Sequence, residues 1–323
     1  MSNEQRTLPD GRKIPLLGMG TSRINKLKSN GEEGNIQEVI YQSIKDGVRL
    51  IDTAFKYDNE KEVGDRIKRA LDDNICKRGD LIIIGKIWIN FRNDPETALR
   101  NTLKNLQLDY IDVYMDHWPS AKVYRFSRVE TRTDKRGKFE MISIYEFWPK
   151  MEKLVEKGLA KFLGVSNYSI QCLSNLLSFC TIRPIMNEVE YHLFYIQKSL
   201  KEFCDKEKIA LIAYYPMPFG HGAKKVIFEE QQKELNIFEN EKIKELAKKY
   251  KKTPGQIILN WHYCQGTIPI PSTSKPFRMK ENLDFLKNQL EDEDVKVLSK
   301  HFKQISLKKF CGCKRFFGVN VLA

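Results

Sequence analysis

Short apolar segments alternate with longer amphipathic segments along the whole sequence, and this order constrains the fold more than any other feature. Each apolar segment has four to six residues, which is typical of a buried strand. Eight strands, each followed by a helical segment, in a chain of 323 residues favour an α/β fold whose parallel sheet closes into a (β/α)8 TIM barrel. The predicted strands span residues 17–21, 48–52, 81–86, 111–116, 162–165, 185–189, 210–213 and 267–270.

The segments between these strands carry signals for the starts and ends of helices. Asp94 and Pro95 suit the N-cap and the first turn of a helix, and Thr253 and Pro254 repeat this pair in TPGQIILNW. Gly158 follows an amphipathic segment and suits the residue that ends a helix. These signals place helices between the predicted strands.

The first predicted strand disfavours the other common α/β fold, the open doubly wound sheet. The dinucleotide fingerprint GxGxxG is expected there, but Gly18 and Gly20 are followed by TSR without a third glycine. The preceding residues, RTLPDGRKIP, predict a β-hairpin with its turn at Asp10 and Gly11 that plugs the amino end of the barrel. Because no linker interrupts the alternation, we expect residues 1–323 to form one domain.

Two segments interrupt the alternation. Residues 119–143 form a long, basic connection after the fourth predicted strand, and loops of this length inside a compact domain are usually functional. We expect this segment to be a substrate loop. Residues 308–323, KKFCGCKRFFGVNVLA, combine aromatic and basic side chains. This tail is interpreted either as a disordered end or as a lid over the mouth of the barrel, because aromatic side chains gain by packing.

The net charge of +13 raises the question of a nucleic-acid partner. Most lysines, however, are mixed with glutamates in helix-like segments such as NEKIKELAKKYKK, which is typical of a solvated helix face. The charge pattern therefore predicts no nucleic-acid partner, although a basic site for a phosphorylated small molecule is compatible with it.

Hydropathy and cysteine content indicate a compartment. No run of about 18 apolar residues exists, and the N-terminal MSNEQRTLPDGRK lacks the apolar core of a signal peptide. We expect a soluble, cytoplasmic protein without a membrane partner. Its seven scattered cysteines suit a reducing compartment, and the absence of CxxC or Cys/His ligand spacing predicts no metal site.

Polar residues at the ends of three consecutive predicted strands point to chemistry. Asp52, Lys86 and His117 end or follow these strands, and Tyr57 lies in the loop after Asp52. Each residue alone more often has a structural role. In a barrel, however, the carboxyl ends of the strands meet at one rim, where a buried ammonium needs a counter-ion. A positive charge also lowers a phenol pKa from about 10, so Lys86 is predicted to make Tyr57 a proton donor.

A series of motifs in register resembles the aldo-keto reductases, in particular the aldose, aldehyde and xylose reductases. The motifs are IDTAFKY, GKIW, LQLDYIDVYMDHWP, LGVSNYS, MNEVEYH, AYYPM and TPGQIILNW, and the resemblance extends from the hairpin to at least Asn282. It implies the same (β/α)8 barrel and a reversible hydride transfer between NADP(H) and a carbonyl or alcohol.

The resemblance also implies roles for individual residues. Tyr57 matches the proton donor, Asp52 and Lys86 match its ion pair, and His117 matches the histidine that orients the substrate. Relatives that reduce a steroid carbon–carbon double bond carry Glu at the position of His117, so carbonyl chemistry is expected here. The implied cofactor-binding residues are Thr21, Ser166, Asn167, Glu188, Tyr214, Lys275, Arg278, Glu281 and Asn282, and the implied substrate-binding residues are Ser22, Trp88 and Trp118.

Three positions depart from the family pattern around the cofactor. Glu188 replaces a Gln, and a carboxylate accepts a hydrogen bond from a carboxamide but cannot donate one. Tyr215 replaces a Ser, and Ser272 stands where a Lys often contacts the 2′-phosphate. Lys275 and Arg278 follow closely, and two cations favour a 2′-phosphate, so NADPH is expected over NADH.

The sequence therefore predicts a cytoplasmic, NADPH-dependent reductase of a small-molecule carbonyl, either a monomer or a weak dimer. Its substrate stays open among aldoses, small reactive aldehydes, aromatic aldehydes and larger ketones. Ser22, which replaces a frequent Trp, indicates a roomier or more polar pocket. The alternative function is a cofactor-binding barrel that serves as a regulatory or structural subunit, because a fold alone does not establish activity.

Overall fold

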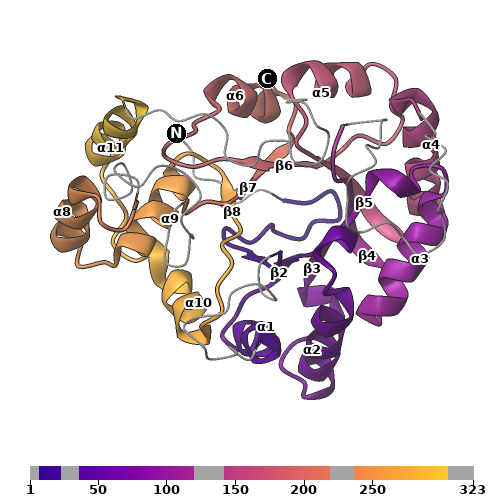
Figure 1. Cartoon of the computed structure of the whole chain (residues 1–323), viewed down its shortest axis with the longest axis horizontal. Helices are drawn as coiled ribbons and strands as arrows, with labels where there is room; N and C mark the ends of the chain where they lie inside the picture. The colour runs from indigo at the N-terminus through magenta and orange to yellow at the C-terminus, as the bar shows by residue number, and fades with distance from the viewer. Residues whose placement is uncertain (1–6, 23–35, 120–141, 219–235, 305–323) are drawn as a thin grey trace.

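The computed structural model describes residues 7–22, 36–119, 142–218 and 236–304 of the chain. Within these ranges, eight parallel strands form one sheet whose spatial order follows the sequence. Helices surround the sheet on its outside (Figure 1). The predicted (β/α)8 barrel is confirmed. The strands are β1 (Met19–Gly20), β2 (Leu50–Asp52), β3 (Ile82–Ile87), β4 (Ile111–Asp116), β5 (Ala160–Ser166), β6 (Met186–Glu190), β7 (Ala210–Tyr214) and β8 (Ile268–Pro269).

The sheet closes where β8 meets β1. The backbone N–H of Gly18 donates to the carbonyl of Pro269 at 3.0 Å, and that of Gly20 donates to Pro271 at 3.1 Å. A Cβ at Gly20 would lie 2.8 Å from the carbonyl oxygen of Ile270, so only glycine permits this approach. These bonds reach beyond the two-residue strands, which are shorter than the predicted segments 17–21 and 267–270.

The helices begin and end as their sequences indicate. The side chain of Asp94 accepts from the backbone N–H of Thr97, and Thr253 forms a capping box with Gln256. Gly158 has a φ of 69°, which is the left-handed region that favours glycine. The α-helices are α1 (Ile36–Lys45), α2 (Glu60–Asp72), α3 (Pro95–Leu106), α4 (Ile144–Glu156), α5 (Ile170–Leu177), α6 (Lys198–Lys206), α8 (Glu241–Tyr250), α9 (Pro254–Cys264), α10 (Pro276–Leu283) and α11 (Asp292–Gln304), and the short 3₁₀ helices are η2 (Phe55–Tyr57), η3 (Arg78–Asp80), η4 (Ile89–Phe91) and η5 (Asp284–Leu286). Across the described ranges, no helix combines the length and the apolar character needed to cross a membrane.

The N-terminal hairpin closes the amino end of the barrel, as predicted. Thr7 and Lys13 pair across it, and Gly11 has a φ of 85° in its turn. Leu8 and Ile14 are buried in the same apolar cluster as the inward-facing side chains of the strands. A second, larger cluster lies between the strands and the helices.

Alternation along each strand places polar side chains at the carboxyl rim. Leu50 on β2 lies in the inner cluster, and Asp52 is the next residue that faces inward. On β3, Ile82 and Ile84 lie in the inner cluster and Lys86 follows them. By the same rule, His117, Ser166, Glu188 and Tyr214 come to the carboxyl rim from the ends of β4, β5, β6 and β7.

Two predicted features fall mainly outside the described residues. The substrate loop at 119–143 is described only at its ends, and the tail at 308–323 is not described. The loop, the lid and the single domain from 1 to 323 stay predictions.

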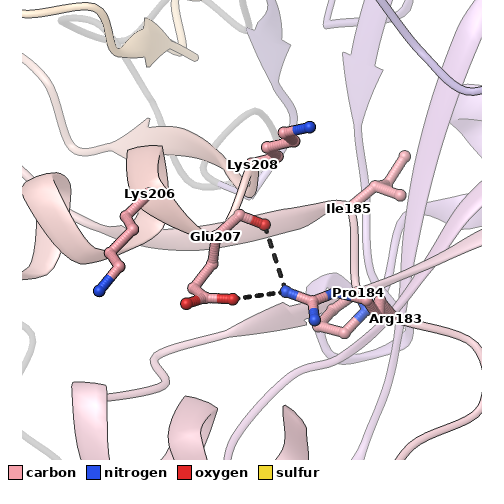
Figure 2. A pocket seen from close by; sticks show the side chains of 6 residues that line it. All are labelled: Arg183, Pro184, Ile185, Lys206, Glu207 and Lys208. Carbon is pink, nitrogen blue, oxygen red and sulfur yellow. Dashed lines mark hydrogen bonds and ion pairs between the residues drawn. The ribbon is translucent and has the colours of Figure 1, made fainter.

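A cavity of about 390 Å³ lies at the amino end of the barrel, opposite to the carboxyl rim. It is lined by the segments that precede β6 and β7 (Figure 2). Arg183 donates to the carboxylate of Glu207 at 2.6 Å, and Lys206 and Lys208 point in different directions (Figure 2). Active sites of such barrels lie at the carboxyl rim, so we assign the pair of Arg183 and Glu207 to stability rather than to chemistry.

Candidate active site

Asp52, Lys86 and Tyr57, which we call the catalytic cluster, meet at the carboxyl rim. The ammonium of Lys86 bonds to Oδ1 of Asp52 and donates to the hydroxyl of Tyr57 at 2.9 Å. Lys86 and Asp52 are buried, whereas Tyr57 is half-buried. Burial raises the pKa of Asp52, and the charge of Lys86 opposes that effect. The arrangement joins a phenol that is open to one side to a buried cation.

The loop after β2 sets the position of the phenol. The short helix η2 begins three residues after Asp52, and Asp58 ends it in the left-handed conformation. Asn59 donates from its side chain to the carbonyl of Thr21 at 2.8 Å, and Thr21 donates to the carbonyl of Asp52 at 2.9 Å. These bonds tie the loop to the end of β1. Thr21, predicted to bind the cofactor, therefore also has a structural role.

His117 lies beside Tyr57 as a neutral imidazole. Their ring centroids are 5.8 Å apart, and the ring of Trp88 crosses that of His117 at 5.3 Å. Burial lowers the pKa of His117 well below its ordinary value, and the charges of Lys86 and Lys56 act in the same direction. Its Nδ1 has no hydrogen-bond partner among the described residues. A neutral ring next to a phenol is suited to binding a carbonyl oxygen.

Three of the predicted cofactor contacts form a chain of hydrogen bonds beside this ring. The side-chain amide of Asn167 donates to the carbonyl of His117 at 3.0 Å and to the hydroxyl of Ser166 at 3.1 Å. Its oxygen accepts from the hydroxyl of Tyr214 at 2.8 Å. Asn167 has a φ of 65°, which asparagine adopts more readily than most residues. The structure brings these side chains to the same rim as the catalytic cluster.

Glu188, the fourth predicted contact on this side, lies inside the catalytic cluster. Its Oε2 is 3.2 Å from the ammonium of Lys86, and both side chains are buried. Burial raises the pKa of Glu188 well above its ordinary value, and the nearby charge of Asp52 raises it further. Sequence analysis assigned Glu188 to the cofactor, and no pattern in the sequence indicated that it faces Lys86.

The predicted contacts for the adenosine end lie on α10 and directly before it. Lys275 precedes the helix, Arg278 lies in its first turn, and no acidic residue lies in that turn. Glu281 accepts from the hydroxyl of Thr253 at 2.7 Å. Two cations near a helix N-terminus are electrostatically suited to a phosphate. Asn282 is buried on the same helix.

The predicted substrate contacts line the same rim. Trp88 and Trp118 are buried, with 3% and 6% of their surfaces exposed, and Trp118 stacks on His117 at 6.4 Å. Ser22 is half-buried directly after Thr21. Sequence analysis missed Lys56, whose ammonium lies 4.9 Å from the ring centroid of Trp88. Its position one residue before Tyr57 was the available signal.

Ser272, which sequence analysis identified as a departure from the expected family pattern, has a structural role here. Its hydroxyl donates to the carbonyl of Gly20 at 2.6 Å. This bond adds to the backbone bonds that join the end of β1 to the segment after β8.

A second group of buried polar residues lies behind the rim. Arg92, Asp116 and Tyr168, which we call the structural cluster, join the segment after η4 to the ends of β4 and β5. The guanidinium of Arg92 bonds to Oδ2 of Asp116 and donates to the carbonyl of Trp118 at 2.8 Å. The hydroxyl of Tyr168 donates to Oδ2 of Asp116 at 2.6 Å. Sequence analysis did not identify this cluster.

Comparison with known proteins decides the family. The model of the Aldo/keto reductase family matches residues 16–303. The chain belongs to this family. Among the relatives of this aldo-keto reductase, "Aldo-keto reductase family 1 member A1" of Gallus gallus is 34% identical over 92% of the chain and 89% of the relative. The "NAD(P)H-dependent D-xylose reductase" of Candida tenuis is 35% identical over 91% of each sequence.

A solved structure agrees with this aldo-keto reductase in fold. The aldo-keto reductase of Bombyx mori in complex with NADP covers 92% of each chain with a TM-score of 0.77 and 30% identity. The chain is an oxidoreductase that interconverts carbonyl and alcohol groups, as its family does. The names of its relatives are names of reductases, so the regulatory-subunit alternative is not favoured.

Proposed function

We propose that this aldo-keto reductase uses NADPH to reduce an aldehyde or ketone to the alcohol, with Tyr57 as the proton donor. The observation that carries the proposal is the bond of 2.9 Å from the ammonium of Lys86 to the hydroxyl of Tyr57. A cation in this position stabilises the phenolate that remains after the proton has left. Asp52 holds that cation in place from the other side.

The residues of this chain are suited to NADP(H). Glu188 has a buried oxygen without a hydrogen-bond partner among the described residues, and the polar side chains of Ser166 and Asn167 lie on the adjacent strand end. Lys275 and Arg278 supply positive charge for a phosphate at the start of α10. When bound, the cofactor supplies the hydride. Ser166, Asn167, Glu188 and Tyr214 would hold its nicotinamide end, and Thr21, Lys275, Arg278, Glu281 and Asn282 its remaining parts.

The chain's own residues then orient the carbonyl and supply a proton. Neutral His117 and the hydroxyl of Tyr57 donate hydrogen bonds to the carbonyl oxygen, so that both polarise it. As the oxygen becomes an alkoxide, Tyr57 transfers its hydroxyl proton to it. The phenolate left on Tyr57 is stabilised by Lys86, which remains a cation because Asp52 accepts from it.

The substrate class follows from the pocket only in part. Trp88 and Trp118 offer apolar walls, and Ser22 adds a small, half-buried polar side chain after β1. Aldoses, small or aromatic aldehydes and larger ketones all fit this description, and relatives named as xylose reductases support an aldose. We propose that residues 1–323 form one domain and that the protein is cytoplasmic. We also propose that it is a monomer or a weak dimer, and sedimentation tests this oligomeric state.

Loss of NADPH absorbance with a panel of sugars, aldehydes and ketones tests the function. Wild type, Tyr57→Phe and Tyr145→Phe are measured side by side, because Tyr145 is 56% exposed on α4 and serves as a remote control. We expect turnover in wild type and Tyr145→Phe and a large loss in Tyr57→Phe. Undiminished turnover in Tyr57→Phe would end the proton-donor assignment. If NADPH binds without turnover in wild type, the regulatory-subunit alternative is favoured.

Cofactor preference requires a separate measurement. The Kd values for NADPH and NADH are compared in wild type and in Lys275→Ala. Because Lys275 is exposed and precedes α10, its loss is expected to weaken NADPH binding more than NADH binding. Tighter binding of NADH than of NADPH by wild type would contradict the preference.

A further inference from the structure

Two buried carboxyl groups share one buried cation in this site. Lys86 bonds to Asp52 on one side and lies 3.2 Å from Oε2 of Glu188 on the other. Asp52 and Glu188 are each 1% exposed, and Lys86 is not exposed. Sequence analysis predicted a single counter-ion for Lys86, namely Asp52. The structure therefore contains one more acidic group than the ion pair needs.

Asp52 and Glu188 cannot both stay ionised beside the single charge of Lys86 at low cost. If both carboxyl groups were ionised, Asp52, Glu188 and Lys86 would together carry a net negative charge although each is at most 1% exposed, and such buried charge is costly. When two carboxyl groups share a site, one of them holds a proton far more tightly than usual. One of these two side chains is therefore protonated near neutral pH.

The contacts identify Glu188 as the protonated group. Asp52 has the shorter contact with Lys86 and receives a second, longer one of 3.5 Å from the hydroxyl of Tyr57. Oε2 of Glu188 has only the longer ion-pair contact of 3.2 Å with Lys86 and no further hydrogen-bond partner among the described residues. Burial raises the pKa of Glu188 well above its ordinary value and the charge of Asp52 raises it further, whereas for Asp52 the rise caused by burial is opposed first by the charge of Lys86.

The surroundings of Glu188 contain few other groups that titrate. Asp52 on β2 raises its pKa and Lys86 on β3 lowers it. The neighbouring strand end of β5 presents uncharged Ser166, and that of β7 presents Tyr214, whose hydroxyl donates to an asparagine. Within the cluster, Tyr57 is the remaining titratable group, and His117 beyond it is neutral at ordinary pH.

We propose that Glu188 is a positioning residue that holds a proton beside Lys86 and thereby controls how readily Tyr57 gives up its own proton. With Glu188 protonated, Lys86 has one anionic partner and retains its capacity to stabilise the phenolate of Tyr57. When Glu188 loses its proton to solvent at alkaline pH, a second negative charge lies beside Lys86. The phenolate is then disfavoured, and Tyr57 becomes a weaker acid. This inference rests on the proposed role of Tyr57 as proton donor.

The same proton changes the expected contact with the cofactor. A protonated carboxyl group has one donor and one acceptor, as a primary amide also offers both. Glu188 in this form can therefore donate as well as accept, as a Gln side chain would. Ionisation removes the donor. The expectation that this residue only accepts holds for the ionised form alone.

Infrared difference spectroscopy of the cofactor-free protein tests whether Glu188 is protonated. A protonated carboxylic acid has a C=O stretching band that a carboxylate lacks. Near neutral pH, we expect wild type to show a band that Glu188→Gln lacks. Glu152→Gln is the matched control, because Glu152 is also buried but accepts from two backbone amides at 2.7 and 2.8 Å. Identical spectra of wild type and Glu188→Gln in this region would overturn the proposal.

The pH dependence of kcat tests the coupling to Tyr57. Each variant's profile is normalised to its own maximum, so that only the shape is compared. In wild type, kcat for reduction is expected to fall at alkaline pH as Glu188 ionises, and in Glu188→Gln this fall should move to higher pH or vanish. Glu188→Asp restores a titrating group and should restore the fall. Superimposable profiles for wild type and Glu188→Gln would overturn the coupling.

The two measurements separate this inference from the proposed function. If Tyr57→Phe keeps full turnover, the proton-donor role fails, and with it the coupling, whereas the infrared band still reports the proton on Glu188. If Tyr57→Phe is inactive and the band is absent, Tyr57 keeps its role and the inference about Glu188 fails.

Discussion

The catalytic cluster and the structural cluster use the same three kinds of group: an aspartate, a cation and a tyrosine. They differ in the hydrogen bond that the phenol makes. Tyr57 accepts from Lys86 at 2.9 Å and makes only a long bond of 3.5 Å to Asp52, whereas Tyr168 donates to Asp116 at 2.6 Å. Burial and the charge of Asp116 raise the pKa of Tyr168 well above its ordinary value. A phenol bound to an anion keeps its proton, and a phenol bound to a cation is prepared to release it.

The cations differ in the same sense. A guanidinium stays charged and forms several bonds in a fixed plane, and Arg92 uses one nitrogen to join Asp116 to the carbonyl of Trp118. The ammonium of Lys86 is a compact charge that reaches Asp52 and Tyr57 together. The comparison indicates that bond direction and access decide which cluster reacts, rather than residue type.

The largest expected effect separates the two phenols. Tyr57→Phe removes the proposed proton donor, so we expect kcat to fall by about 10²- to 10⁴-fold. Tyr168→Phe removes a bond to a buried carboxylate and is expected to lower the free energy of unfolding by about 1.5–3 kcal/mol, with kcat largely retained. NADPH absorbance and urea unfolding measure the two quantities on both variants. Equal loss of kcat in both variants would contradict the separation of roles.

The second prediction concerns the cation of the structural cluster. Arg92→Met leaves Asp116 buried without its charged partner, and such a change costs about 3–5 kcal/mol. Urea unfolding near neutral pH measures the loss. Arg100→Met is the control, because Arg100 is 58% exposed and its pair with Glu96 on α3 is worth about 0–1 kcal/mol. An equal, small loss in both variants would show that Asp116 tolerates burial alone.

The catalytic cluster was predictable because its members follow short strands whose inward positions alternate. Leu50 precedes Asp52 by two residues, and Ile84 precedes Lys86 in the same way. The barrel topology then brings both ends to one rim. The structural cluster was not predictable, because Asp116 lies one residue before the inward-facing His117 and points to the other side of the strand. Its partner Arg92 follows a short turn that no periodicity specifies.

Glu188 shows a second limit of sequence reasoning. Its identity as a departure from the family pattern was evident, but its neighbour was not. Lys86 lies on β3 and Glu188 on β6, and these strands are not adjacent in the sheet. Their contact depends on how the closed barrel directs side chains into its centre, which the order of residues along the chain does not specify.

The third prediction compares unfolding at several pH values. Because the pKa of Glu188 is raised in the folded protein, folding binds a proton that the unfolded chain releases above about pH 4.3. Its contribution to the free energy of unfolding therefore decreases as the pH rises toward the folded pKa, by about 1.4 kcal/mol per pH unit, and levels off above it. Glu188→Gln lacks this loss. Relative to wild type, the variant should become more stable as the pH rises, and a pH-independent difference would contradict the shift.

The smallest expected effect measures how far the charges around the catalytic cluster act. Burial is the main reason that the pKa of His117 is lowered, followed by the charges of Lys86 and Lys56. Lys56→Met removes the last of these, so the pKa of His117 should rise slightly, and more of its ring should be protonated at a given acidic pH. NMR titration of labelled histidine, assigned with His117→Asn, measures the shift. Lys61→Met is the control, because Lys61 is 74% exposed and pairs with Asp65 on α2. An unchanged titration in Lys56→Met would show that solvent screens this charge, and that burial and Lys86 alone keep the imidazole neutral beside Tyr57.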